Sequence, residues 1–430
     1  MNILELINKK RLGQVLTEAE IDFLLSAYMK NEMADYQMSS FLMAVCLQGM
    51  NDEETYFLTK AMINSGDKLD LSSIPGIKVD KHSTGGVGDK TTLILAPLVA
   101  SCGIPVVKMS GRSLGFSGGT IDKVESIPGF KTNISLEECV SYCQKIGIVL
   151  ASQTGNLVPA DKKLYALRDV SGTVESISLI ASSIMSKKIA SGADKIVIDL
   201  KVGNGAFMKN LDDASKLANL MVKIGELYNR QTVCLITDMS QPLGYAVGNT
   251  LEVLESMEVL NGRGPKDVKK LVIQLGALMV SLAQNIDLTL AIELVSSKLS
   301  NGQAYAKFIE FVTNQEGRLN EMKIAANKLV IKSPKEGYVK TINCEAIGEL
   351  VRQLGGGRYH KDDIVDHGVG LILNKKIGNK VLIDETLVTV IYNQKEVNPQ
   401  TVIDCFEIVN EPITEPTLID GIVNSKSQVN

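Results

Sequence analysis

The segment Asp80-Lys-His-Ser-Thr-Gly-Gly-Val-Gly-Asp-Lys-Thr-Thr92 decides the fold, because it joins an apolar strand-like run to an apolar helix-like run through glycines. Glycines let backbone N–H groups approach an anion, and the N-terminus of the following helix adds the positive end of its dipole. The segment lacks the Gly-Lys-Ser/Thr of a P-loop and the spacing of a G-x-G-x-x-G turn. A plain strand-to-helix turn is the alternative, but Lys81, Ser83 and Thr92 carry groups that suit phosphate oxygens.

A second glycine-rich segment, Lys108-Met-Ser-Gly-Arg-Ser-Leu-Gly-Phe-Ser-Gly-Gly-Thr120, also follows an apolar run and leads into a helix-like stretch. Short β-branched runs alternate with helical patterns along this part of the chain, at Ile77–Val79, Pro105–Val107, Gly147–Leu150, Lys195–Leu200 and Val233–Thr237. Such alternation predicts a mainly parallel sheet with helices on its faces. Because ligands bind at the carboxyl ends of such strands, the two glycine segments should converge on one phosphate or phosphoester.

The regions around this alternation have other patterns. Residues 1–65 are expected to be helical, with a capping box at Thr17-Glu-Ala-Glu20 and an acidic helix start at Asp52. A largely helical insert, Pro159–Ile189, interrupts the strand–helix alternation. From about residue 330 onward, short β-rich runs and turns predict a small C-terminal domain.

Composition excludes several classes of function. The chain has 45 Lys and Arg against 49 Asp and Glu, a net charge of −4, and 5% aromatic residues without Trp, so we expect no nucleic-acid partner. No apolar run approaches the roughly 20 residues that span a bilayer, and Glu5 interrupts the apolar N-terminus where a signal peptide would be uncharged, so we expect no membrane association. Seven scattered cysteines without a C-x2-C pair indicate reduced thiols in the cytoplasm.

A third group of candidate residues comprises Arg168, Ser183 and Lys187. Ser183 and Lys187 are four residues apart on a predicted helix and therefore share a face. Spacing alone favours the interpretation of a surface helix with ordinary charges. We likewise interpret several neighbouring charges as solvated surface groups, namely Lys162, Lys163, Asp169 and Lys188.

Five segments together resemble the thymidine phosphorylase/pyrimidine-nucleoside phosphorylase family. They are Lys81–Asp89, Ser110–Arg112 with Gly118–Glu125, Pro159–Asp169, Ser182–Lys188 and Asp238–Gly244, and they span most of the chain in unbroken order. The resemblance implies a pentosyltransferase that cleaves uridine, deoxyuridine and thymidine with inorganic phosphate. The products would be the free base and a pentose 1-phosphate, made without an organic cofactor, and family members are usually homodimers.

The resemblance also implies an architecture. It is an α/β fold with a discontinuous small helical domain, made of residues 1–65 plus about 160–190. A mainly parallel-sheet α/β domain, residues 70–159 and 191–330, would hold the phosphate site, and residues 331–430 would form a C-terminal α+β domain. The base would lie on the helical domain and phosphate on the α/β domain, so that catalysis would require the two to close.

Site residues carry over by matching motif. Phosphate would be held by Lys81, Ser83, Thr92, Lys108, Ser110 and Thr120. The pyrimidine would be held by His82, Arg168, Ser183 and Lys187. His82, Arg168 and Lys187 are expected to be catalytic, because negative charge develops on the departing base. Lys108 matches the broad-specificity members of the family, which implies that uridine is accepted as well as thymidine.

Some positions depart from the family pattern. Ser113, Phe116 and Ser117 stand where the family often has other residues, which puts sugar preference and turnover in question. Broad-specificity relatives bind potassium at positions matching Gly88, Lys90, Leu243, Ala246 and Glu255. Lys90 here replaces a usual threonine, so its ammonium group either turns outward, leaving a weakened potassium site, or turns inward and takes the place of the cation. The intact segment 241–246 favours the weakened potassium site.

Two other functions fit parts of the pattern. An anthranilate-type phosphoribosyltransferase has a related fold and glycine-rich turn, but it would require acidic residues that hold magnesium on a pyrophosphate. A non-catalytic nucleoside-binding protein could retain the same motifs without turnover. The combination of Arg168, Ser183 and Lys187 favours the phosphorylase over the phosphoribosyltransferase. The presence of Lys81, His82, Arg168 and Lys187 argues against a protein without turnover.

Overall fold

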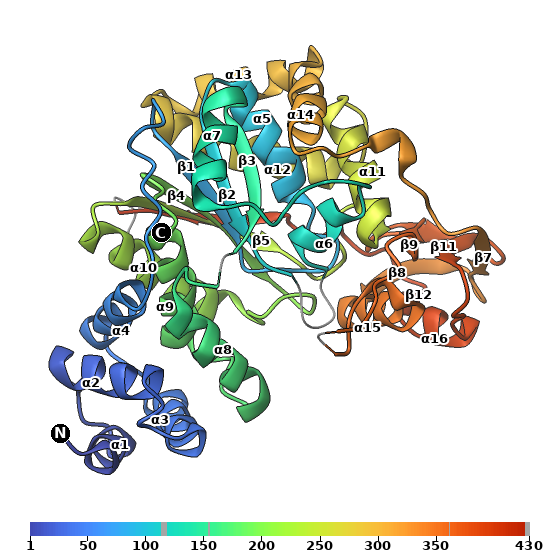
Figure 1. Ribbon diagram of the computed structural model, residues 1–430. Coiled ribbons are helices and arrows are strands. Elements are labelled where there is room, and N and C mark those ends of the chain that lie inside the picture. Colours follow the sequence, from blue (N-terminus) through green and yellow to red (C-terminus); the bar gives the residue numbers. More distant parts are fainter. Residues whose placement is uncertain (113–117, 154, 361, 426–430) are drawn as a thin grey trace.

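In the computed structural model, which describes residues 1–112, 118–153, 155–360 and 362–425, helices from two separate parts of the chain pack into one small domain (Figure 1). The helices are α1 (Ile3–Arg11), α2 (Glu18–Met29), α3 (Asp35–Gln48), α4 (Asp52–Asn64), α8 (Pro159–Ser171) and α9 (Ile177–Ala190). The predicted capping box is confirmed, because the Thr17 side chain accepts from the Glu20 N–H while the Glu20 carboxylate accepts from the Thr17 N–H. Leu24, Phe41 and Leu164 share one buried cluster, so α8 packs on the N-terminal helices.

A mainly parallel sheet lies at the centre of the next part of the chain. Its strands run in the order β1 (Val79–Ser83), β4 (Lys195–Val202), β5 (Gln231–Asp238) and β13 (Ile419–Val423), of which the first three are parallel. A second parallel pair, β2 (Val106–Ser110) and β3 (Ile148–Ser152), lies beside β1. The predicted α/β fold is confirmed. The predicted runs Ile77–Val79 and Pro105–Val107 end too early, because the polar residues that follow them continue the strands.

Helices cover both faces of the central sheet. They are α5 (Thr91–Ser101), α6 (Thr120–Glu125), α7 (Leu136–Ile146), α10 (Leu211–Leu227), α11 (Asn249–Leu260), α12 (Lys266–Gln284), α13 (Leu288–Ser300) and α14 (Gln303–Asn314), followed by a short 3₁₀ turn, η1 (Leu319–Glu321). The strand β4 shows why the central sheet has a separate hydrophobic core on each of its faces. Ile196 and Ile198 pack with α9 and α10, whereas Val197 packs with α5 and α12 on the opposite face.

The last part of the chain forms a domain of two small sheets and short helices. Its elements are β7 (Asn327–Lys332), β8 (Gly337–Ile342), α15 (Cys344–Val351), η2 (Arg352–Gly356), β9 (Gly370–Leu373), β10 (Lys380–Val381), β11 (Thr386–Tyr392), α16 (Pro399–Ile403) and β12 (Phe406–Val409). The prediction that this domain contains both helices and strands is confirmed.

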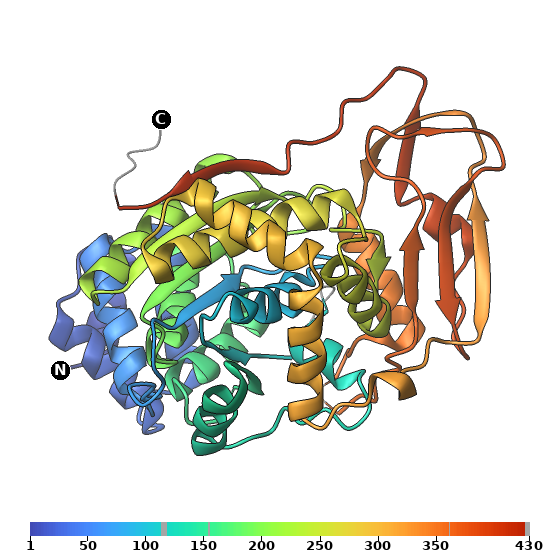
Figure 2. The ribbon, with the colours of Figure 1, turned by 90° about the horizontal axis from the view of Figure 1, so that it is seen from above.

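Two strands cross between the central and C-terminal parts. The strand β6 (Ala246–Val247), which leaves the central part of the chain, pairs with β9 of the C-terminal domain. In the other direction, β13 leaves the C-terminal domain and pairs antiparallel with β5 (Figure 2). The sequence analysis placed residues 331–430 together, but the apolar run that ends at Val423 completes the edge of the central sheet instead.

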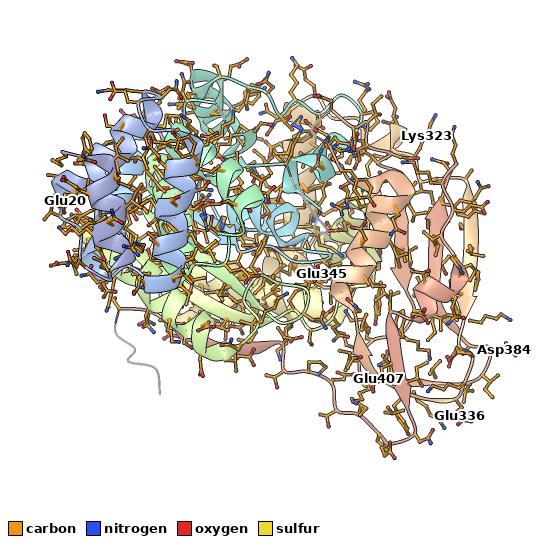
Figure 3. The ribbon with its side chains drawn as sticks, turned by 90° about the horizontal axis from the view of Figure 1, so that it is seen from below. Glu20, Lys323, Glu336, Glu345, Asp384 and Glu407 are labelled. Atoms are coloured by element: carbon orange, nitrogen blue, oxygen red, sulfur yellow. The ribbon has the colours of Figure 1, made fainter. Side chains whose placement is uncertain are left out.

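Charged side chains on the outside of the molecule are exposed to solvent, whereas several of those near the central sheet are buried. Glu336, Asp384 and Glu407 are exposed on the C-terminal domain (Figure 3), and an exposed ion pair such as Lys340 with Glu407 contributes little to stability. Among the described residues, no single helix is long and apolar enough to cross a membrane, although α12 and α13 together reach that length and composition with a bend of 119° between them. All seven cysteines are free thiols.

Candidate active site

Lys81 lies on β1 where the strand approaches the N-terminus of α5. Its side chain is buried, and its ammonium group donates a hydrogen bond to the Thr91 hydroxyl and lies 3.5 Å from the Asp199 carboxylate. Thr91 is the first residue of α5, so the positive end of the helix dipole adds to the charge of Lys81. An anion bound here would meet a cation together with the first backbone N–H groups of a helix.

A network of buried charges that the sequence analysis did not identify surrounds Lys81. Lys201 on β4 is completely buried, and its Nζ lies 2.9 Å from Asp199 Oδ2. Burial alone would raise the pKa of Asp89, but Lys81, Lys201 and Lys123 hold it well below its usual range. The available signal was the presence of Asp199 and Lys201 inside an apolar strand, because such charges are seldom buried unless they are paired.

Lys108 projects from β2 toward β1. Its ammonium group lies 3.1 Å from Asp80 Oδ1 and donates a hydrogen bond of 2.5 Å to the Lys81 carbonyl. Burial lowers the pKa of Lys108 to about 7, with Lys188 and Lys81 adding to the effect and Asp80 opposing it. The positive charge of Lys108 therefore depends on pH near neutrality.

The other residues expected to hold phosphate stand at the ends of strands and the starts of helices. Ser83 ends β1 and Ser110 ends β2, while Thr120 begins α6 and Thr92 is the second residue of α5. Hydroxyl groups thus stand where the strands end and the helices begin, and their contact with phosphate stays a prediction. The departures from the family pattern at Ser113, Phe116 and Ser117 lie outside the described residues.

Arg168 on α8 is buried and held by the backbone that follows its helix. The guanidinium group donates hydrogen bonds to the carbonyl oxygens of Thr173 at 3.1 Å, Val174 at 2.7 Å and Leu179 at 3.2 Å. Three of the five N–H groups of a guanidinium are thereby used to fix its position. A cation held in one orientation is suited to stabilise negative charge that develops in a transition state.

Ser183 and Lys187 share one face of α9, as their spacing predicted. The Lys187 ammonium group donates to Ser183 Oγ at 3.0 Å and lies 2.7 Å from Asp161 Oδ2. The Ser183 hydroxyl accepts in this contact, so its own O–H remains a possible donor to a ligand. Asp161, which the sequence analysis did not single out, thus orients the lysine from α8.

Lys188 corrects the interpretation of its charge as a solvated surface group. It is 3% exposed, and its Nζ lies 2.5 Å from Asp80 Oδ2. Asp80 also pairs with Lys108, so its two carboxylate oxygens bind lysines from different elements. A single sequence cannot reveal that pairing, because the three residues lie far apart in the chain.

His82 lies between the phosphate-side and base-side candidates. Burial lowers the pKa of His82 well below its ordinary value, and the positive charges of Lys188, Lys108, Lys187 and Lys81 lower it further. His82 is therefore neutral at pH 7. It can donate one hydrogen bond from its ring, but it does not supply a proton as an imidazolium acid.

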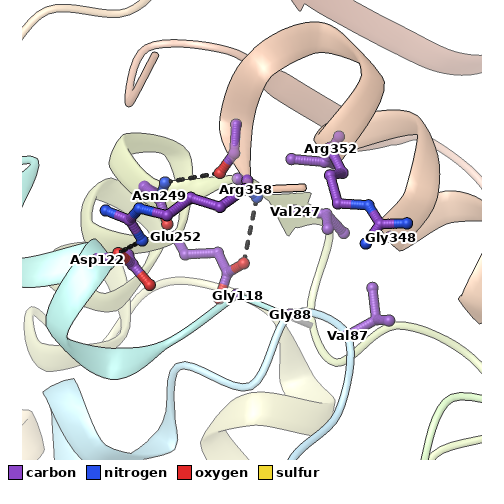
Figure 4. A pocket seen from close by; sticks show the side chains of 14 residues that line it. Val87, Gly88, Gly118, Asp122, Val247, Asn249, Glu252, Gly348, Arg352 and Arg358 are labelled. Atoms are coloured by element: carbon purple, nitrogen blue, oxygen red, sulfur yellow. Dashed lines mark hydrogen bonds and ion pairs between the residues drawn. The ribbon is translucent and has the colours of Figure 1, made fainter. Parts of the chain in front are cut away.

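The C-terminal domain closes a small pocket beside the glycine segments (Figure 4). Arg358 pairs with Asp122 of α6 at 2.5 Å, and the Asn249 side chain donates to the Gly356 carbonyl at 3.0 Å. None of the residues expected to hold the pyrimidine, His82, Arg168, Ser183 and Lys187, is among the residues that line this pocket. We therefore interpret it as a contact between domains that holds α6, and with it Thr120, in place.

The residues expected to bind potassium do not fit a metal ion in this arrangement. The side chain of Lys90 turns inward, and its ammonium group lies 2.9 Å from the Leu243 carbonyl oxygen and 2.8 Å from that of Ala246. It also forms an ion pair with Glu255. The expectation of a weakened potassium site assumed that this side chain points outward, whereas the Leu243, Ala246 and Glu255 oxygens proposed as metal ligands bind the ammonium group.

Family comparisons agree with this geometry. The helical bundle domain of a glycosyl transferase family matches residues 4–66, the a/b domain of that family matches residues 76–305, and the pyrimidine nucleoside phosphorylase C-terminal domain matches residues 338–409. The solved anthranilate phosphoribosyltransferase of Thermus thermophilus is similar in fold, with a TM-score of 0.58 and 18% identity over 72% of this chain and 99% of that one. That likeness concerns the fold alone.

Curated relatives are similar over almost the whole chain. The pyrimidine-nucleoside phosphorylase of Staphylococcus epidermidis is 50% identical and covers 98% of this chain and 100% of its own length. The enzymes of the same name from Geobacillus stearothermophilus and Staphylococcus aureus are 50% and 49% identical, over 97% and 98% of this chain and 99% and 100% of their own lengths. With its three matched domains and this identity, the chain belongs to the pyrimidine-nucleoside phosphorylase family.

Proposed function

We propose that this protein catalyses the phosphorolysis of pyrimidine nucleosides, including uridine, deoxyuridine and thymidine. The observation that carries the proposal is the position of His82 on β1, where it follows Lys81 and where the ion pair of Asp80 with Lys188 holds α9 against the same strand. Lys81 and Lys108 belong to the strands that precede the glycine segments, whereas Lys187 belongs to the helix that also carries Ser183. One neutral ring thus lies among cations suited to phosphate and cations suited to a pyrimidine.

The reaction needs both groups at once. A phosphate oxygen forms a bond to C1′ of the sugar while the C1′–N1 bond breaks, and the electron pair of that bond leaves with the pyrimidine. The base then gains the proton that hydrogen phosphate gives up, so atoms and charge balance. Arg168 and Lys187 stabilise the negative charge on the departing ring, and the neutral His82 donates a hydrogen bond to it.

On the other side, Lys81 and Lys108 bind and orient the phosphate nucleophile. The hydroxyls of Ser83, Thr92, Ser110 and Thr120 complete its hydrogen bonds at the helix N-termini. Ser183 holds the base together with Arg168. This arrangement needs no covalent intermediate, because phosphate itself is the nucleophile and the protein contributes orientation and charge.

The decisive experiment follows free uracil and ribose 1-phosphate from uridine, with and without inorganic phosphate. We expect equal amounts of the two products, formed only when phosphate is present. Release of uracil that does not depend on phosphate would contradict phosphorolysis. Binding of uridine without any product, in phosphate, would instead support a non-catalytic nucleoside-binding protein.

We also propose that the protein is a homodimer in the cytoplasm. Tyr36 and Leu47 are 75% and 76% exposed on one face of α3, and Leu12, the residue that follows the adjacent α1, is 65% exposed. A patch of large exposed apolar side chains on a folded protein marks an interaction surface. Light scattering after size exclusion should give twice the mass of the chain, and Leu47→Glu should lower it to that of a monomer. A monomeric wild-type protein would contradict the proposal of a dimer.

The cytoplasmic location is supported by the seven free thiols, which suit a reducing compartment.

A further inference from the structure

Lys90 is a completely buried lysine whose ammonium group is surrounded by oxygen atoms from another part of the chain. It lies at the end of the first glycine segment, immediately before α5. Its Nζ donates to the carbonyl oxygens of Leu243 at 2.9 Å and Ala246 at 2.8 Å and pairs with the Glu255 carboxylate. Two carbonyls and one carboxylate thus surround a single positive charge, and oxygen donors of this kind also suit a hard metal cation.

The remaining polar groups of the 241–246 loop are also engaged. Lys376 of the C-terminal domain donates to the carbonyls of Pro242 and Gly244 and lies 3.2 Å from Asp267. The second oxygen of Glu255 accepts the backbone N–H groups of residues 245 and 246, at 3.0 and 3.1 Å. The four carbonyls of residues 242, 243, 244 and 246 therefore all accept from lysine side chains, and those of 243 and 246 are among the five positions expected to bind potassium.

We propose that the ammonium group of Lys90 is a built-in cation, which joins the first glycine segment to the 241–246 loop and makes a bound potassium ion unnecessary. A potassium ion placed among the same oxygens would lie against the ammonium group, and the two positive charges would repel each other strongly. Because the lysine is part of the chain, the cation is present at any salt composition.

The position of Lys90 gives this cation a function. Gly88, two residues earlier, lies so close to the loop that a Cβ atom there would come within 2.7 Å of the Leu243 carbonyl oxygen. On the other side of Lys90, the Thr91 hydroxyl bonds to both Asp89 and Lys81. Lys90 is therefore a positioning residue. It fixes the segment that presents Lys81 to phosphate, and this part of the inference rests on the proposed function.

The first test compares potassium chloride with choline chloride at equal ionic strength, using the wild-type protein. We expect the melting temperature to be the same in both salts, and the KM for phosphate to differ by less than about twofold. A wild-type melting temperature that rises with potassium, and saturates, would overturn the proposal. This measurement does not require any variant to fold.

The second test removes the built-in cation. Lys90→Thr leaves the oxygens in place but opens space for an ion, so in choline we expect a lower melting temperature and a KM for phosphate raised about tenfold or more. Potassium should restore both, with a saturable dependence. Lys90→Met fills the same space without charge, so it should be impaired in both salts and gain nothing from potassium.

Lys10→Thr is the matched control. Lys10 is 2% exposed and pairs with Glu54 at 2.8 Å, but in the helical domain and without a ring of carbonyl oxygens. We expect it to lose stability equally in both salts. A Lys90→Thr protein that behaves like this control would overturn the proposal. Because melting temperature needs no turnover, failure of the built-in cation can be distinguished from failure of the proposed phosphorolysis.

Discussion

Asp80 Oδ2 on β1 and Lys188 Nζ on α9 lie 2.5 Å apart, and this buried ion pair joins a strand of the central sheet to a helix of the helical domain. Lys188 directly follows Lys187, whose side chain faces Ser183. In this arrangement the pair therefore holds the helix that carries base-side residues against the strand that carries His82.

We expect Asp80→Asn to lower the free energy of unfolding by about 3 kcal/mol, because it leaves Lys108 and Lys188 buried without their carboxylate. Urea denaturation measures the change. The control is Glu18→Gln, which breaks the exposed pair with Lys60, where both side chains are more than 40% exposed, and should leave stability nearly unchanged. Equal effects of the two substitutions would show that the buried pair is not a structural link.

Arg168→Ala should lower kcat/KM for uridine roughly 100-fold or more, because it removes a fixed donor from the developing pyrimidine anion. Steady-state kinetics with saturating phosphate measure the effect. The KM for phosphate should be nearly unchanged, since Arg168 lies on the base side. A loss of less than about threefold would place Arg168 outside the site.

Lys108→Met should reduce kcat/KM for uridine more than for thymidine. Methionine cannot hydrogen-bond a 2′-hydroxyl, whereas any contact of Lys108 with phosphate affects both substrates equally. The ratio of the two kcat/KM values is therefore the measurement. An unchanged ratio would exclude Lys108 from sugar selectivity.

The phosphate affinity of the wild-type protein should decrease above pH 7. Burial lowers the pKa of Lys108 to about 7, so its ammonium group loses its proton as the pH rises through neutrality. Lys108→Met provides the baseline, since it retains the titration of phosphate itself but not that of the lysine. If the KM for phosphate has the same pH dependence in both proteins, Lys108 keeps its charge above pH 7 and the prediction is wrong.

His82 should stay neutral throughout the range in which a free histidine titrates, because burial and four lysines lower its pKa. Its NMR resonances should therefore not shift between pH 8 and pH 6. Below the ordinary pKa of about 6.5, the unfolded chain binds a proton at this residue that the folded protein does not bind, so the contribution of His82 to stability is lost as the pH falls. His82→Gln should lower kcat without altering the acid side of the pH–rate profile.

Much of the fold could be predicted from local patterns. The capping box at Thr17, the acidic helix start at Asp52 and the β-branched runs before each glycine segment depend on neighbouring residues alone. The same holds for Ser183 and Lys187, because a helix brings residues four apart onto one face. The strand ends were missed because Asp80 and Lys81 are polar, and they are buried only through partners elsewhere in the chain.

The parts of the site that could not be predicted depend on contacts between residues that lie far apart in the chain. Lys188, interpreted as a surface charge, is buried because Asp80 lies 108 positions earlier in the chain and faces it across the domain boundary. The inward direction of Lys90 follows from the carbonyls of Leu243 and Ala246, about 150 residues later. No period or spacing in a single sequence encodes such pairs.

The return of β13 to the central sheet constrains how the protein can fold while it is being synthesised. β5 is translated long before Ile419–Val423, so its outer edge lacks this partner until those residues have left the ribosome. An open strand edge is a template for pairing with other chains. The central sheet of this enzyme is therefore finished only after the whole C-terminal domain has been synthesised, and the nascent chain must protect that edge until then.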